Sequence, residues 1–243
     1  MLSNQLFLDK VLTSFKEFIS CGTSRSTAKL KPLHGAIATD IAEQLGDKYK
    51  VWSQGYGKGK EKKINGRYID KMVDITIEDA TTHIPVAGIG IKFVMQNYSQ
   101  NSNNYFENML GETANIRTAN CPYFQIFIIL DKLPYYKKSG TIKKWEEFTD
   151  HNMSKYSKLS ADDVCRFMHT PNKTLICVAH ITPDVPATTN KKNEYMEFYK
   201  NNIDKLKISV SNHKYKGIVS NGTIIMNDYE LFVKKVYHTI KSI

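Results

Sequence analysis

Two neighbouring stretches of alternating apolar and polar residues constrain the fold more than any other feature of the chain. Residues 73–77 (VDITI) place Asp74 opposite three apolar side chains of an extended strand, and residues 86–93 (VAGIGIKF) do the same for Lys92. The link between them is short and polar, and Pro85 stands where a strand can begin. The pattern therefore predicts a β-hairpin that brings Asp74 and Lys92 together across the ladder.

The rest of the chain predicts how this hairpin is covered. Residues 125–130 (QIFIIL) and 174–181 (TLICVAHI) are nearly continuous apolar runs, typical of central strands that are covered on both faces. Amphipathic helices are predicted at residues 8–19, 32–45, 164–168, 194–206 and 229–240. Together these elements predict an α/β fold with a mixed central β-sheet flanked by helices, formed by residues 1–243 as a single domain.

The charge of the chain favours a polyanionic partner. The formal net charge is +10 and the pI is about 9.2, which favours nucleic acid and salt-dependent binding, whereas the alternative is a basic surface that is merely solvated. Residues 53–67 are rich in glycine and lysine and are predicted to form a mobile loop, or alternatively an exposed hairpin. The cations proposed to contact DNA there are Lys58, Lys60, Lys62, Lys63 and Arg67. A second basic region spans residues 137–144.

A polar segment at residues 96–104 is predicted to be a loop that reads bases. Side-chain amides both donate and accept hydrogen bonds, as base edges in a groove require. The candidates are Gln96, Asn97, Gln100, Asn101, Asn103 and Asn104.

Other classes of site are less favoured. The four cysteines stand far apart without a zinc-binding spacing, and the chain has neither a leader pattern nor an apolar run long enough to span a membrane. We therefore expect a cytoplasmic protein with reduced thiols. On the second predicted helix, His34 and Glu43 could face a metal or a nucleic acid, but such lone polar residues are usually exposed to solvent.

Asp74 and Lys92 suit phosphodiester cleavage if a second carboxylate joins them. Such cleavage uses a divalent cation on hard oxygen ligands, and a cationic group that stabilises the transition state. Asp70 and Glu78 are each four residues from Asp74, about 13 Å along a strand, which is too far to share one ion. Glu107, on the helix expected after the polar loop, is the first candidate, with Glu112 in reserve. The alternative for Glu107 is a capping arrangement with residue 104.

These residues resemble the PD-(D/E)XK nuclease superfamily, especially its type II restriction endonucleases. The resemblance covers about residues 33–130 and rests on Asp74 followed by the GIK sequence that ends at Lys92. The stretches GKGKEKKINGRYIDKMVDI and SNNYFENMLGETAN are also similar to segments of such enzymes. The chain departs from the family pattern where Gly90 replaces the expected carboxylate and Val73 replaces proline. Some members carry the second carboxylate on the following helix, at a spacing similar to that of Glu107.

The resemblance implies a function and a set of site residues. It implies Mg²⁺-dependent, sequence-specific cleavage of double-stranded DNA, with Asp74, Lys92 and Glu107 as catalytic residues. Asp74, Glu107 and the main chain of Ile91 would hold the metal. It further implies a homodimer and a companion DNA methyltransferase. A repair, phage or mobile-element nuclease of the same fold stays open, as does a DNA-binding module that has lost catalysis.

Overall fold

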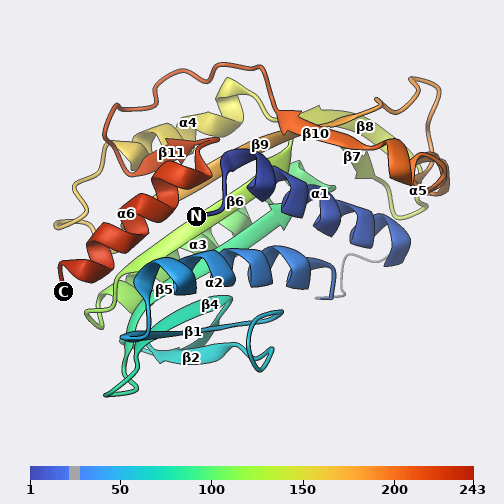
Figure 1. Ribbon diagram of the computed structural model, residues 1–243. Helices are drawn as coiled ribbons and strands as arrows, with labels where there is room; N and C mark the ends of the chain where they lie inside the picture. The colour runs from blue at the N-terminus through green and yellow to red at the C-terminus, as the bar shows by residue number, and fades with distance from the viewer. Residues whose placement is uncertain (22–27) are drawn as a thin grey trace.

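The computed structural model describes residues 1–21 and 28–243 (Figure 1). Its centre is a seven-stranded sheet in the order β1-β4-β5-β6-β9-β10, with β11 also paired to β9. These strands are β1 (Tyr49–Ser53), β4 (Ile75–Asp79), β5 (Pro85–Val94), β6 (Tyr123–Leu130), β9 (Thr174–Thr182), β10 (Lys207–Val210) and β11 (Ile224–Met226). Two-stranded sheets are formed by β2 (Lys62–Asn65) with β3 (Asp70–Val73), and by β7 (Lys132–Tyr136) with β8 (Ile142–Glu147).

The central sheet is mixed, as the sequence predicts. Strands β1, β4 and β5 pair antiparallel, β5, β6 and β9 pair parallel, and β10 returns antiparallel to β9. Every residue of β6 is buried, because helices cover both faces of a parallel strand pair. The predicted α/β class with a mixed sheet flanked by helices is therefore confirmed.

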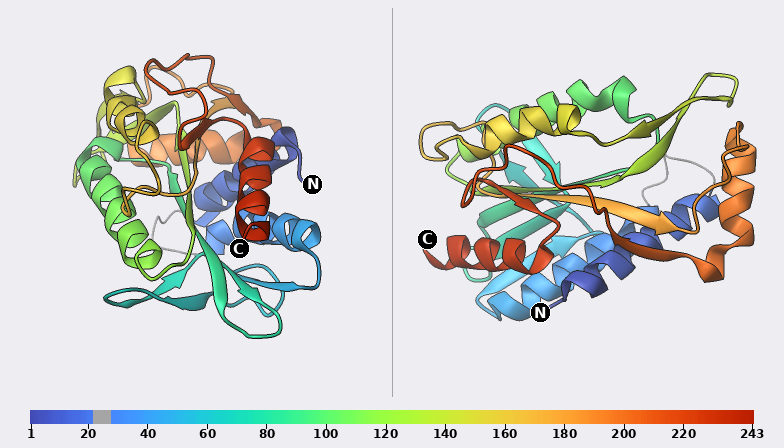
Figure 2. Two further views of the ribbon diagram at one scale, coloured as in Figure 1. Left: turned by 90° about the vertical axis from the view of Figure 1, so that its left-hand side faces the viewer. Right: turned by 90° about the horizontal axis from the view of Figure 1, so that it is seen from above.

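The α-helices of the described residues lie around the central sheet. Figure 2 shows α1, α2 and α6 on one face of the sheet and α3 and α4 on the other. Their apolar stripes face the sheet, so Phe15 of α1, Ile37 of α2 and Phe232 of α6 are fully buried. No helix among residues 1–21 and 28–243 combines the length and apolar character needed to cross a bilayer. The helices are α1 (Asn4–Cys21), α2 (Lys31–Leu45), α3 (Tyr98–Arg117), α4 (Asp150–Ser160), α5 (Lys192–Asn201) and α6 (Tyr229–Lys241), with 3₁₀ turns at Ala28–Leu30 and Ile203–Lys205.

The predicted hairpin exists, but the strand that carries Asp74 is interrupted at that residue. Ile75 pairs with Ile89 in the antiparallel β4–β5 ladder. The residues immediately before Asp74 belong to β3, which pairs with β2 outside the central sheet. After Asp74 the chain enters the central sheet as β4. The Ser53 hydroxyl donates to the Asp74 carbonyl oxygen at 2.7 Å and fixes the backbone at this corner. Asp74 thus stands where two sheets diverge, which frees its side chain from the regular pleat.

The prediction of a loop at residues 96–104 is wrong, because α3 begins at Tyr98. Tyr98 is 2% exposed, and its ring lies 5.5 Å from that of Phe148. The Glu146 carboxylate, arriving from β8, accepts from the Ser99 amide at 3.2 Å and supplies a distant cap. Residues 104 and 107 both lie inside the helix, so they are not the capping pair that the sequence offered as an alternative.

Two further predictions need correction. The helix predicted at residues 164–168 is absent: α4 ends at Ser160, and residues 164–168 form turns. The Arg117 guanidinium donates to the carbonyl oxygens of Val164, Phe167 and Thr170 at 2.6 to 2.9 Å. These bonds replace the backbone hydrogen bonds that a helix would make here. The segment at 53–67 is not wholly a loop, because residues 62–65 form β2 and pair with β3 in an exposed hairpin.

Candidate active site

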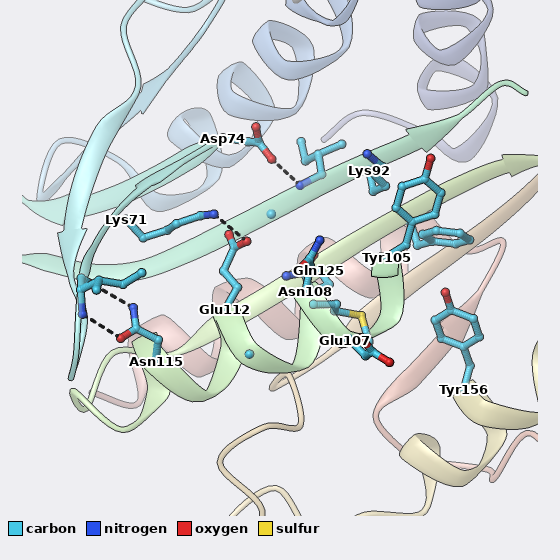
Figure 3. Close-up of a pocket in the computed structure, with 16 residues that line it drawn as sticks. Lys71, Asp74, Lys92, Tyr105, Glu107, Asn108, Glu112, Asn115, Gln125 and Tyr156 are labelled. Carbon is cyan, nitrogen blue, oxygen red and sulfur yellow. Dashed lines mark hydrogen bonds and ion pairs between the residues drawn. The ribbon is translucent and has the colours of Figure 1, made fainter. Parts of the chain in front are cut away.

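A pocket of about 510 Å³ lies between α3 and the face of the central sheet at β5 and β6 (Figure 3). Its walls include the four charged residues that the sequence singles out: Asp74, Lys92, Glu107 and Glu112. The structure therefore brings the charged residues of the hairpin and of the following helix to one place. Their positions within the pocket differ.

Asp74 is held by the backbone of the neighbouring strand. The Ile91 amide donates to Asp74 Oδ2 at 2.6 Å, which fixes the orientation of the carboxylate. Burial raises the pKa of Asp74 to about 6, and the nearby Glu112 also raises it, whereas the Ile91 hydrogen bond lowers it. The carboxylate is therefore mostly ionised at neutral pH, although ionisation is less favourable than in water.

Lys92 is the exposed position in an otherwise buried run of β5. Ile91 and Phe93 on either side are 8% and 9% exposed, and the alternating strand turns Lys92 to the opposite face. Its Nζ lies 4.4 Å from the centre of the Tyr105 ring on α3. Partial burial lowers the pKa of Lys92, and Asp74 raises it. The ammonium group is thus held beside Asp74 and still reaches solvent.

The two candidates for the second carboxylate are placed differently. Glu107 is exposed, and Figure 3 shows its carboxylate at the rim, pointing away from Asp74. Glu112 is 22% exposed, lies 3.2 Å from Lys71 Nζ, and raises the pKa of Asp74. The geometry therefore brings Glu112, and not Glu107, into electrostatic contact with Asp74.

Gly90 explains how Glu112 is held. A Cβ atom at Gly90 would lie 2.6 Å from the Tyr123 hydroxyl and 2.8 Å from Gln125 Oε1, so β6 side chains fill the space where the family pattern has a carboxylate. The Tyr123 hydroxyl donates to Glu112 Oε1. A glycine at residue 90 thus makes room for the tyrosine that positions the helix carboxylate.

A second group of possible metal ligands meets at Asp74. One ligand atom each from His34, Glu61 and Asp74 lie within 4.8 Å of one another. His34 is 2% exposed, and burial lowers its pKa to about 4, so its imidazole is neutral at neutral pH. Burial, and then Asp74, raise the pKa of Glu61, while Gln54 Nε2 donates to Glu61 Oε1 at 2.8 Å.

The sequence does not single out His34 and Glu61 as partners of Asp74. A close backbone contact between α2 and the segment after β1 brings them together. A side chain at Gly35 would overlap the carbonyl group of Gly55, and one at Gly55 would overlap the carbonyl group of Lys31. Gly55 also has φ = +79°, which glycine adopts most readily. The two glycines thus allow the close approach that places His34 and Glu61 beside Asp74.

The residues predicted to contact DNA differ in their contacts within the fold and in their exposure to solvent. Lys62 forms an ion pair with the buried Glu78, and the Asn97 side chain accepts from the Tyr136 amide at 2.7 Å, so both are engaged within the fold. Asn103 Oδ1 accepts from Lys155 Nζ at 3.4 Å. Gln96 and Asn101 line a neighbouring pocket that also includes Lys92. The exposed members are Lys58, Lys60, Lys63, Arg67, Gln100, Asn103 and Asn104.

Comparisons of the chain with protein-family models, with curated proteins and with solved structures gave no match.

Proposed function

We propose that this protein is a divalent-metal-dependent endonuclease of restriction-endonuclease-like fold that cleaves double-stranded DNA at a specific sequence. One observation carries the proposal: Asp74, fixed by the Ile91 amide, shares a pocket with Lys92 and a second carboxylate. The basic surface of the chain supports a polyanionic substrate. The wider proposal, from the resemblance of residues 33–130, includes a cytoplasmic homodimer and a companion DNA methyltransferase.

The donor set in the pocket suits a magnesium ion. Asp74, Glu112 and the side-chain amide of Gln125 all line the pocket, and Mg²⁺ prefers hard oxygen ligands of this kind. We propose that Asp74, the main chain of Ile91 and a second carboxylate hold the ion. Glu112 is favoured over Glu107 as that carboxylate, because its charge lies close enough to Asp74 to raise the pKa of the Asp74 carboxyl group. The bound ion would polarise the scissile phosphate and acidify a water molecule.

The charged side chains around Asp74, and the exposed cations outside the pocket, would have separate roles in phosphodiester hydrolysis. The Ile91 amide keeps Asp74 oriented. The Lys92 ammonium, braced by the Tyr105 ring, faces the same space and would neutralise charge that develops on the phosphate oxygens. Lys71 Nζ, 3.2 Å from a Glu112 carboxylate oxygen, would hold that side chain in place through the ion pair. Exposed cations at Lys58, Lys60, Lys63 and Arg67 would contact the DNA backbone.

Digestion of plasmid DNA with the purified protein and Mg²⁺ tests the function. Discrete bands are expected, and Asp74→Ala should abolish them while DNA binding is retained. Lys92→Ala should lower the cleavage rate by about 100-fold or more, with a smaller effect on affinity. Smeared or structure-selective products would instead indicate a repair or phage nuclease, and gel retardation without cleavage a binding module. Cleavage that survives Asp74→Ala would remove this pocket from the reaction.

A matched pair of variants decides the second carboxylate. Glu112→Gln keeps the size of the side chain and its acceptor for the Tyr123 hydroxyl, but removes the charge. We expect it to reduce cleavage at limiting Mg²⁺ at least about tenfold, because a metal ligand is lost. Glu107→Gln, on the same helix, is the control and should cut at nearly the wild-type rate. The reverse order of effects would assign the role to Glu107.

A further inference from the structure

We propose that His34, Glu61 and Asp74 form a second metal site, which takes a transition-metal ion such as Mn²⁺ through a mixed nitrogen and oxygen ligand set. The site lies on the α2 side of Asp74, whereas Glu112 lies on the α3 side. The metal site itself depends only on these three side chains. Its use in DNA cleavage rests on the proposed function.

The ligand atoms are close enough to share an ion. They lie within 4.8 Å of one another, so an ion at their centre would lie at most about 2.8 Å from each, compared with bonds of about 2.1 Å. A movement of up to about 0.7 Å by each ligand atom therefore closes the set around an ion. In Figure 3, one oxygen of Asp74 meets the Ile91 amide, and the other lies on the side away from Glu112. A single carboxylate can thus serve both sides of the corner.

His34 supplies the independent evidence for a ligand. Its side chain is 2% exposed, yet neither Nδ1 nor Nε2 has a hydrogen-bond partner among the described residues. A buried polar group without a partner destabilises the fold, and such groups are rare unless a ligand or a function accounts for them. Coordination of an ion through one ring nitrogen would satisfy an atom that the fold leaves unpaired.

The surroundings of the cluster also suit a metal site. Gln54 donates to Glu61 Oε1 at 2.8 Å, and the Ile91 amide holds Asp74, so both carboxylates are oriented before any ion arrives. An imidazole ligand suits zinc, copper, iron and nickel, and the two carboxylates also suit Mn²⁺, whereas Mg²⁺ favours oxygen ligands alone. The cluster should therefore differ in metal preference from the oxygen-rich pocket beside Glu112.

Titration with Mn²⁺ tests the proposal, because Mn²⁺ binds thiols weakly and gives a direct magnetic signal. The protein, without a histidine tag, should show ¹⁴N coupling from a coordinated imidazole in the pulsed EPR spectrum of bound Mn²⁺. The coupling should disappear in His34→Ala and persist in His180→Ala. His180 is a matched control, because its Nδ1 lies 3.0 Å from Asp131 in another histidine–carboxylate pair. Wild-type protein without ¹⁴N coupling, or coupling that survives His34→Ala, would overturn the site.

Two more variants protect the test against misfolding and separate it from the function. If His34→Ala fails to fold by circular dichroism, Glu61→Gln decides: it should weaken Mn²⁺ binding about tenfold or more, and an unchanged affinity rejects the site. Glu112→Gln should leave the ¹⁴N coupling in place. A protein that binds Mn²⁺ through His34 but cuts no DNA would retain the metal site and lose the proposed function. Mg²⁺-dependent cleavage without ¹⁴N coupling would reject the metal site and retain the proposed function.

Discussion

Asp74 is an acid whose ionisation the fold makes less favourable, and this has a measurable cost in stability. Its pKa is raised from 3.8 to about 6, chiefly by burial. Below the lower value both folded and unfolded forms are protonated, so no cost exists. The cost grows as the pH rises through this window and is complete above it. The titratable groups that face Asp74 are Glu112, Lys71, Lys92, Glu61 and His34.

Replacing Asp74 with asparagine should therefore stabilise the metal-free protein. We expect Asp74→Asn to raise the free energy of unfolding by about 2 to 3 kcal/mol at pH 8, with the gain shrinking as the pH falls toward 4. Denaturant unfolding in the presence of EDTA measures it. Asp79→Asn is the control and should give no gain, because hydrogen bonds from Thr82 and Thr81 lower the pKa of Asp79. Equal behaviour of the two variants would contradict this account of Asp74.

At the scale of elements, α3 depends on a cap from a distant strand. Glu146 of β8 is 6% exposed and accepts from the Ser99 amide and hydroxyl at the first turn of the helix. We expect Glu146→Ala to lower the free energy of unfolding by about 1 to 3 kcal/mol, since it leaves a helix-terminal donor unpaired. Thermal or urea denaturation checks this. The exposed neighbour should behave as a surface site, so Glu147→Ala changes stability by no more than about 0.5 kcal/mol.

This cap also explains where sequence reasoning about the elements fails. The amides at residues 96–104 are typical of a loop, and the residue that starts the helix, Tyr98, is buried by Phe148 from elsewhere in the chain. Glu146 lies 47 residues from Ser99. Likewise, the carbonyl groups that would form a helix at 164–168 bind Arg117. Local propensity carries no information about such long-range partners.

Strands with strong alternation or continuous apolar character are predicted well. The hairpin and the buried strands follow from side-chain periodicity alone, and so does the presence of Asp74 and Lys92 in one pocket. Glu112 and His34 are harder to place. The first is positioned by a hydroxyl group of β6, and the second meets Asp74 because α2 touches a distant segment. Sequence spacing encodes neither contact.

At the scale of the whole molecule, the excess of cations matters according to which of them are free to meet DNA. Lys63 is exposed, whereas the adjacent Lys62 is paired with Glu78, whose side chain is 1% exposed. On the proposed function, Lys63→Ala should reduce the slope of log affinity against log salt by about 1. Lys62→Ala should leave the slope unchanged and lower the free energy of unfolding instead, because it leaves the buried Glu78 carboxylate without its cationic partner.

Fluorescence anisotropy of a labelled duplex, measured in metal-free buffer from low to moderate salt, gives these slopes. Thermal unfolding of the same two proteins supplies the stability comparison. A salt slope that changes equally in both variants would show that Lys62 leaves Glu78 when DNA binds. A slope that changes in neither would remove the β2–β3 hairpin from the DNA-binding surface.

The contact between Gly35 and Gly55 has a consequence for how the molecule tolerates change. Surface loops usually accept insertions and substitutions, and residues 57–60 are exposed. Gly55, only two residues before them, leaves no space for a side chain. A single turn thus contains both a position open to variation and one closed to it. Lys58 and Lys60 can therefore be replaced without strain in the backbone, whereas Gly57 and Gly59, with φ of +54° and +65°, keep the turn in the conformation that delivers Glu61 to Asp74.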